Sequence, residues 1–179
     1  MDGWMKIKTD FVTNSSSSSF IVAFPQKIRR IEDVEMFIAP KYSKTIYDDA
    51  KAQKPMRITN KNIVQKLGEE ISHGFIKEME AFSSWGIGGR SYEDEFCERE
   101  GITTEDLRNN QTWRQQLWDE EDRRRLEVST EAAAKFISQL TEDHFIYMFH
   151  YGDEDGEYFS EMEHGNIFHA IPSFRISKH

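Results

Sequence analysis

The chain has little cysteine and no long apolar run, and each shortage excludes a class of protein. Cys97 is the only cysteine among 179 residues, so no intramolecular disulfide can form and a reducing compartment is expected. The N-terminal apolar run Phe20 to Phe24 stops at Pro25 and is shorter than the core of about 7 to 15 residues in a signal peptide. No stretch approaches the roughly 20 apolar residues of a membrane span. We therefore expect a cytoplasmic protein that does not enter a membrane.

Basic side chains are also in deficit. The chain carries 32 acidic and 23 basic residues, which gives a formal net charge of −9. Affinity for nucleic acid comes largely from Lys and Arg that displace counterions, so direct binding to nucleic acid is not expected. The acid instead suits a protein partner with a basic surface. The pattern carries no signal for an oligomeric state.

The one thiol is a poor candidate for a nucleophile. Cys97 lies between Glu95 and Glu98. Neighbouring carboxylates raise the pKa of a thiol, whereas a reactive cysteine needs a lowered one.

What the chain does have is enough apolar and aromatic residues for one folded domain over residues 1–179. It is 37% hydrophobic and 13% aromatic. Alternating or apolar segments predict strands near residues 6–12, 20–24, 144–151 and 173–178. Apolar stripes at helical spacing predict helices near residues 31–38, 60–82, 104–125 and 129–140. The fold class is therefore α+β or mixed α/β, with a small sheet covered by amphipathic helices.

Three further segments carry coarser predictions. Pro40 is expected to end the helix before it, and residues 42–56 indicate a loop or a weak helix. Residues 83–101 begin with a glycine-rich stretch and continue with acid, which predicts a long surface loop. The segment 144–151 is apolar on both faces, as is typical of a central strand, and the strands on either side of residues 159–171 predict a crossover unit.

Five consecutive serines, Ser15 to Ser19, separate the first two predicted strands. Serine and asparagine readily bond their own backbone in turns, so the run is interpreted mostly as a turn. An anion site is the alternative, and its candidate residues are Asn14, Ser15, Ser16 and Ser17. The run has no glycine and leads into a strand rather than a helix, which argues against that alternative. A nucleophilic serine, phosphorylation and disorder remain as other interpretations.

The segment from Met5 to Phe20, MKIKTDFVTNSSSSSF, resembles the opening of a group of uncharacterised bacterial and phage-related proteins. Residues 163–165 and 175–179 are similar to tails in that group. The resemblance implies a bacterial or phage origin and an opening that is an ordered part of the domain. It implies no activity and no catalytic residue.

The C-terminal region gathers carboxylates and imidazoles, the ligand types of divalent cations. The candidate metal ligands are Asp153, Asp155, Glu161 and His164, and the candidate catalytic residues are Glu163 and His164. No complete metal motif such as His-Glu-x-x-His is present. No cofactor is therefore predicted, and a divalent metal belongs to the alternative interpretation, a metal- or acid/base-dependent hydrolase.

Acidic blocks supply the leading interpretation. The candidate contact residues are Trp85, Glu93, Asp94, Glu95, Asp119, Glu120, Glu121 and Asp122. Arginines accompany most of the blocks, which favours the plainer explanation that they are solvated, self-paired faces and loops. With no complete catalytic constellation, we expect a non-enzymatic interaction protein. An inhibitor of a basic or nucleic-acid-handling host protein is the most specific form of this hypothesis.

Overall fold

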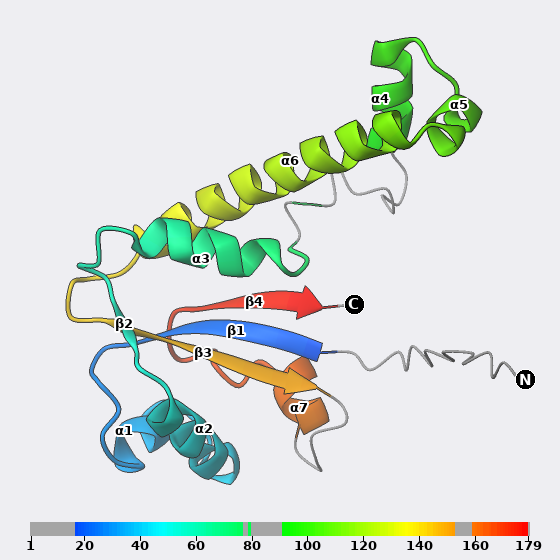
Figure 1. Ribbon diagram of the computed structural model, residues 1–179. Helices are drawn as coiled ribbons and strands as arrows, with labels where there is room; N and C mark the ends of the chain where they lie inside the picture. The colour runs from blue at the N-terminus through cyan, green and yellow to red at the C-terminus, as the bar shows by residue number, and fades with distance from the viewer. Residues whose placement is uncertain (1–16, 77–78, 80–90, 153–158, 179) are drawn as a thin grey trace, which may run out of the picture.

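The computed structural model describes residues 17–76, 79, 91–152 and 159–178. They form an α+β fold in which a four-stranded antiparallel sheet lies between two groups of helices (Figure 1). The fold class predicted from the sequence is confirmed. The strand predicted at residues 6–12 lies outside the described residues.

The sheet is built around β1, Ser17–Phe24, which lies between two antiparallel partners. β3 spans Phe145–Gly152 and β4 spans Ser173–Lys178. The short strand β2, Met56–Arg57, gives the order β2-β3-β1-β4. Because β3 and β4 both oppose β1, they run parallel to each other, and the connection between them passes over β1.

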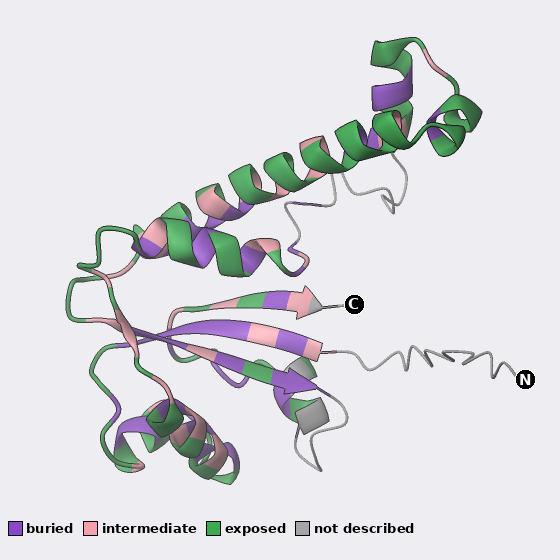
Figure 2. Cartoon of the chain, viewed as in Figure 1, coloured by how far each residue is buried: buried purple, intermediate pink, exposed green. Residues whose placement is uncertain are grey.

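Both faces of β1 are buried. Phe20, Val22 and Phe24 point to one face and Ile21 and Ala23 to the other, and each of these side chains is at most 5% exposed. In Figure 2 the strand is coloured as buried over most of its length. A strand covered on both sides has no solvent face to keep polar, which explains the continuous apolar run.

One face of the sheet is covered by α1, Glu32–Glu35, by α2, Pro40–Ala52, and by α7, Phe159–His164 (Figure 1). Of the loop or weak helix expected over residues 42–56, the structure has a helix, α2, which runs to Ala52. Pro40 does not simply end the preceding helix, because it begins the next one. Proline is favoured in the first helical turn, where its missing N–H leaves no hydrogen bond unmade.

The other face is covered by α3, Ile63–Ser72, and by the C-terminal half of α6, Gln111–Ile137. α3 ends well before the predicted boundary at residue 82, because the chain after it joins the sheet. The N–H of Phe75 donates to the carbonyl of Ser177 at 2.7 Å, and the N–H of Ser177 donates back at 3.0 Å. This bridge fixes the chain after α3 at the outer edge of β4.

α6 is one helix of 27 residues, whereas the sequence predicts two helices that meet near residues 125–129. Ser129 does not cap a second helix, because its Oγ donates to the carbonyl of Arg125 at 2.7 Å inside the first. Thr130 makes the same bond to Leu126 at 2.7 Å. At 1.5 Å per residue the helix is roughly 40 Å long. Neither α6 nor any other helix in the described part of the chain is apolar enough over a sufficient length to cross a membrane.

α3 and α6 approach each other closely at Gly68. A Cβ at this position would lie 2.7 Å from Thr130 Oγ1 and 3.0 Å from Thr130 Cα, so the missing side chain allows the contact. A second contact joins α6 to the chain after α3, since Arg125 Nη1 donates a hydrogen bond to the carbonyl of Gly74 at 3.3 Å. These contacts anchor one half of α6 to the rest of the fold.

The outer edge of β3 is covered by β2 at Ile146 and then by a side chain. Gln53 Nε2 donates to the carbonyl of Met148 at 2.9 Å, and Gln53 Oε1 accepts from the Met148 N–H at 2.8 Å. The side-chain amide therefore continues the pairing of the sheet edge two residues beyond Ile146.

The surface loop predicted at residues 83–101 is wrong over its second half, because Tyr92–Glu100 forms the helix α4. Residues 83–90 lie outside the described residues. Ser91 and Asp94 form a capping box at the start of α4, and Gly101, with a φ of 68°, ends it. Start and stop signals are thus both present in a segment whose glycine and acid content indicates a loop.

Candidate functional site

A helical arm projects from the sheet and its covering helices. It consists of α4, α5, which spans Thr104–Asn109, and the first half of α6 (Figure 1). We define the arm as residues 91–126. Its three helices enclose a small apolar core whose buried members are Tyr92, Phe96, Cys97, Leu107 and Leu117. Phe96 packs edge-on against Trp113, with 6.2 Å between the ring centroids.

Short polar side chains set the turns of the arm. Thr103 and Asp106 form a capping box at the start of α5. Asn110 ends α5 and caps α6, since its Oδ1 accepts from the N–H of Thr112 at 2.9 Å and from that of Trp113 at 3.3 Å. Each turn is therefore fixed by a local hydrogen bond.

Glu120 clamps α4 onto α6. Tyr92 Oη donates to Glu120 Oε2 at 2.8 Å, and Arg99 Nη2 lies 2.9 Å from both carboxylate oxygens. Burial raises the pKa of Glu120, but these hydrogen bonds outweigh it, and the net shift of the pKa is downward. Glu120 is one of the contact residues predicted from the sequence, yet its carboxylate is used within the arm.

Three more of the predicted contact residues are partly committed to the arm itself. Asp94 belongs to the capping box of α4. Glu93 and Glu121 are half-buried. Burial raises the pKa of Glu121, although Arg125 acts in the opposite direction. Trp85 lies outside the described residues.

The exposed candidates gather around a tryptophan. Trp118 is 52% exposed, whereas its neighbour Leu117 is buried, because successive helix residues differ in direction by about 100°. Asp119, Asp122 and Leu126 lie within about 100° of Trp118 on the same side of α6. Both carboxylates are exposed, and Leu126 is 41% exposed. We call these four residues the tryptophan face.

The sequence predicts part of this surface and misses its centre. Asp119 and Asp122 are among the acidic candidates, as is the exposed Glu95 on α4. Trp118, in contrast, is expected to lie beside Leu117 among the apolar residues of the helix. The helical spacing is the signal that corrects this: Leu117 follows Trp113 by four residues and lies about 40° from it, whereas Trp118 lies about 140° from Trp113.

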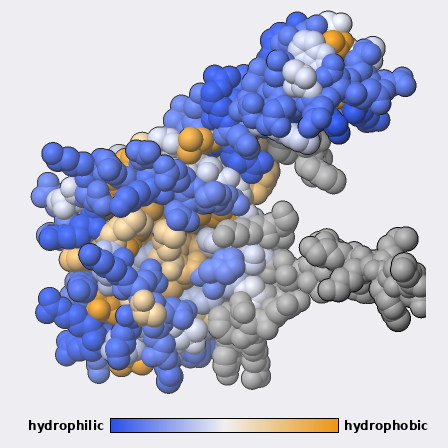
Figure 3. Space-filling model, in the orientation of Figure 1, coloured by the Kyte–Doolittle hydropathy of each residue, from blue (hydrophilic) through white to orange (hydrophobic). Residues whose placement is uncertain are grey.

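The arm also concentrates negative charge. Residues 91–126 contain eleven acidic and six basic side chains, so they account for more than half of the net charge of the chain. Two of the arginines stack on aromatic rings of the arm itself, with Arg99 5.1 Å from the Phe96 centroid and Arg124 5.0 Å from that of Tyr92. Figure 3 shows a predominantly hydrophilic surface over the arm.

The serine run is partly strand. The turn predicted there is wrong for Ser17, Ser18 and Ser19, which open β1. The other candidates for an anion site, Asn14, Ser15 and Ser16, lie outside the described residues. Ser18 Oγ accepts a hydrogen bond from Arg175 Nε at 3.1 Å, and Ser19 Oγ lies 3.0 Å from His150 Nδ1. These two hydroxyls are therefore held by side chains of the neighbouring strands.

The contact between Ser19 and His150 resembles the start of a catalytic pair. It borders a pocket of about 190 Å³ that Glu70 also lines. Nucleophilic catalysis further requires a third group that orients the imidazole. Within the described residues His150 makes no other side-chain hydrogen bond. Ser19 and His150 are also direct partners in the register of β1 and β3, so cross-strand pairing alone explains their contact.

The C-terminal candidates are only partly described. Asp153 and Asp155 lie outside the described residues, as does the side chain of Glu163. Glu161 is engaged, since its Oε2 lies 2.6 Å from Lys41 Nζ and 2.5 Å from Tyr42 Oη. The bond from Lys41, followed by that from Tyr42, lowers the pKa of Glu161. His164 is exposed at the end of α7.

Metal-binding geometry is not assembled in the part of the chain that the structure describes. There, no three His, Cys, Asp or Glu side chains converge in a way that could hold an ion. The hydrolase alternative therefore gains no geometric support from Glu161, whose carboxylate already binds Lys41.

Comparison with known proteins adds no relative. No known protein family matches the chain. No characterised protein matches it. No solved structure matches it. What the protein does must therefore be argued from the arm and from the chemistry of its surface.

Proposed function

We propose that this is a non-enzymatic interaction protein whose arm binds a basic surface on a partner protein. The observation that carries the proposal is the tryptophan face, where Trp118 is exposed beside Asp119 and Asp122 on a projecting helix. Tryptophan is among the residues that contribute most energy to protein interfaces.

The chemistry of this surface favours lysine and arginine on the partner. A cation within about 6 Å of a tryptophan ring is attracted to its face. The two carboxylates can pair with the same cations, and Leu126 extends the apolar contact. The excess of acid over the whole arm would also speed the approach of a basic partner.

A protein that handles nucleic acid presents such a surface, because it has to neutralise phosphates. We propose this class as the target. The resemblance of residues 5–20 implies a bacterial or phage origin. In that setting, a protein that covers the nucleic-acid-binding surface of a host enzyme or regulator would inhibit it.

The test begins with affinity capture from a bacterial extract by the wild-type protein, by Trp118→Ala and by Met36→Ala. Met36 is the matched control, since it is an exposed hydrophobic residue, 67% accessible, at the C-cap of α1 and away from the arm. The protein captured by the wild type and by Met36→Ala, but not by Trp118→Ala, is then purified for calorimetric titration.

The titration decides the matter. Trp118→Ala should weaken binding by about 2 kcal/mol, which is roughly 30-fold. Raising the salt from about 50 to 300 mM should weaken the wild-type complex severalfold, and Asp119→Asn with Asp122→Asn should reduce that salt dependence. An affinity that ignores both the salt and Trp118→Ala would refute the proposal.

A further inference from the structure

The loop between β1 and α1, residues 25–31, holds three cations in an otherwise acidic protein. Lys27, Arg29 and Arg30 are exposed, while Ile28 between them is buried. The loop lies at the opposite end of the molecule from α4 and α5 (Figure 1). Its charges are therefore separate from those of the arm.

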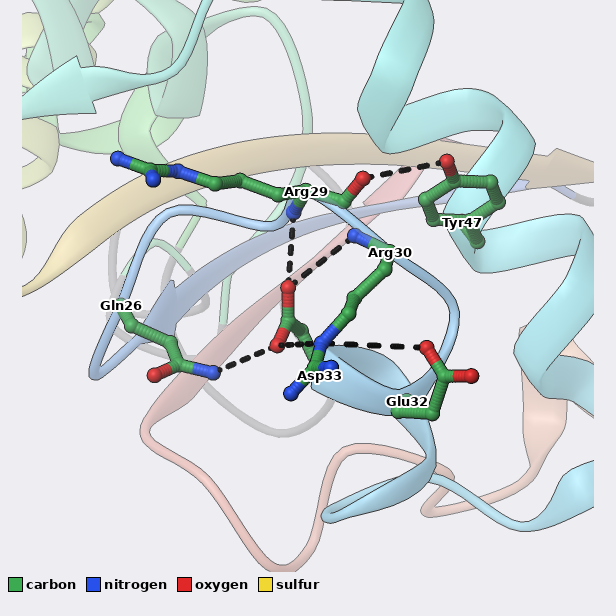
Figure 4. A network of polar contacts seen from close by, with 6 residues as sticks. All are labelled: Gln26, Arg29, Arg30, Glu32, Asp33 and Tyr47. Carbon is green, nitrogen blue, oxygen red and sulfur yellow. Dashed lines mark hydrogen bonds and ion pairs between the residues drawn. The ribbon is translucent and has the colours of Figure 1, made fainter.

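Asp33 holds this loop in a fixed shape (Figure 4). Its Oδ2 accepts hydrogen bonds from the backbone N–H of Arg29 at 2.9 Å and from that of Arg30 at 3.1 Å. Its Oδ1 accepts one from Gln26 Nε2 at 2.9 Å. Asp33 is only 6% exposed, so its negative charge is directed into the loop backbone rather than toward solvent.

Two tyrosines hold the same loop from other elements. The N–H of Ile28 donates to Tyr147 Oη on β3 at 2.9 Å, and Tyr47 Oη on α2 donates to the carbonyl of Arg29 at 3.3 Å. With Ile28 fixed inward, its neighbours Lys27 and Arg29 are fixed outward. The cations are thus presented by a rigid backbone.

Only part of the positive charge of this loop is neutralised within the described residues, through Arg30. Arg30 Nε lies 3.5 Å from Asp33 Oδ1 and 4.0 Å from Glu32 Oε2. The side chains of Lys27 and Arg29 have no acidic partner in the part of the chain that the structure describes. In Figure 4 the guanidinium of Arg29 points away from Asp33. An anion between these like charges would relieve their repulsion.

The three cations line an open pocket of about 570 Å³ together with Phe145 and two carboxylates, Asp33 and Asp143. The guanidinium of Arg57 lies 5.5 Å from the centroid of the Phe145 ring and adds a fourth cation beside the pocket. The volume is within the range of about 300 to 1,000 Å³ that is usual for small-molecule sites. The pocket therefore combines cations, an aromatic wall and room for a ligand.

We propose that this pocket binds a small anion with two or more phosphate groups, of the size of a nucleoside diphosphate or triphosphate. Arginine forks and lysine ammonium groups are the side chains that bind phosphate oxygens. Phe145 offers a flat wall for a base, and Asp143 can accept a hydrogen bond from a sugar hydroxyl. The site is independent of the partner proposed for the arm.

Isothermal titration calorimetry with three probes tests the proposal: inorganic tripolyphosphate, ATP and adenosine. Tripolyphosphate and ATP should bind with dissociation constants below about 1 mM in 0.1 M salt, whereas adenosine should not bind. Equal affinity for the two phosphates would show that phosphate alone is recognised. Tighter binding of ATP would show that its base or ribose contributes as well.

The variant Lys27→Gln with Arg29→Gln should weaken binding of both phosphate probes by at least about tenfold. Arg108→Gln with Arg114→Gln, which removes two exposed cations from the arm, is the control for net charge and should leave the affinity unchanged. Thermal unfolding of each variant checks that the fold is retained. Equal losses in both pairs, or no binding of either phosphate to the wild type, would overturn the proposal.

Discussion

Replacing Gly68 with alanine should destabilise the protein, although alanine is the better helix former. In an exposed helix the change Gly→Ala is expected to stabilise by about 1 kcal/mol. Gly68, however, is buried where α3 crosses α6, and a Cβ there would lie 3.0 Å from Thr130 Cα and 3.2 Å from Thr130 N. Backbone atoms cannot rotate away as a side chain can.

The size of the effect follows from that contact. Nonbonded carbons settle at about 3.5 to 4.0 Å, so the two helices must separate by roughly 0.5 to 1 Å. Overpacking of this kind costs about 1 to 3 kcal/mol, which exceeds the gain in helix propensity. We expect a net loss of about 1 kcal/mol, or about 2 to 4 °C in the melting temperature.

Urea and thermal unfolding, followed by circular dichroism, measure the change. Lys66→Ala is the matched control, because Lys66 is exposed on the same helix and lysine and alanine have similar helix propensities. Thr130→Ala removes the closest atom that the new methyl group would meet, Oγ1, at 2.7 Å. In that background Gly68→Ala should cost less. A Gly68→Ala protein that is more stable than the wild type would refute the reasoning.

Two further predictions concern ionisable groups. Asp33 accepts several hydrogen bonds in the folded state, and the one from the backbone N–H of Arg29 does most to lower its pKa. The stabilisation from Asp33 is therefore present above its unfolded pKa of about 3.9 and is lost as the pH falls through the lower folded value. Asp33→Asn should flatten the loss of stability between about pH 5 and 2 in urea titrations, and an unchanged slope would contradict this. Burial, followed by the charges of Glu93 and Asp94, raises the pKa of the Cys97 thiol. A disulfide reagent at neutral pH should therefore label Cys97 far more slowly in the folded protein than after unfolding in urea, and equal rates would contradict this.

The sequence predicts the parts of the fold that depend on local pattern. The apolar run at residues 20–24 predicts a strand, and it forms most of β1. The segment 144–151 is apolar on both faces and is predicted as a central strand, and it forms β3 inside the sheet. Both predictions succeed because a buried strand has to be apolar wherever it is placed in the sheet.

Prediction fails where a distant partner decides the outcome. Ser18 and Ser19 are typical of a turn, but Arg175 and His150 on the flanking strands bind their hydroxyls, so they extend β1. The start of β1 therefore depends on residues more than a hundred positions away.

The helix boundaries and the surface contacts show the same limit. Residues 73–82 carry an apolar stripe that predicts more of α3, whereas Phe75 pairs with β4. The side chain of Gln53 takes the place of a strand backbone beside Met148, and strand propensities do not describe such a contact. In the candidate surface, the acidic residues of the arm are predicted from the sequence. The exposure of Trp118 is recognised only once Leu117 is known to face α4 and α5.

The central position of β1 has a consequence for how the protein is made. Ser19 lies 131 residues before its partner His150, and Ser18 lies 157 residues before Arg175. At a synthesis rate of about 5 to 20 residues per second, β1 waits on the order of ten seconds for its first neighbouring strand. During that time a segment that is apolar on both faces has no sheet to join, and contacts of such high sequence separation form slowly. We therefore expect a chaperone that shields this strand during synthesis to raise the yield of folded protein.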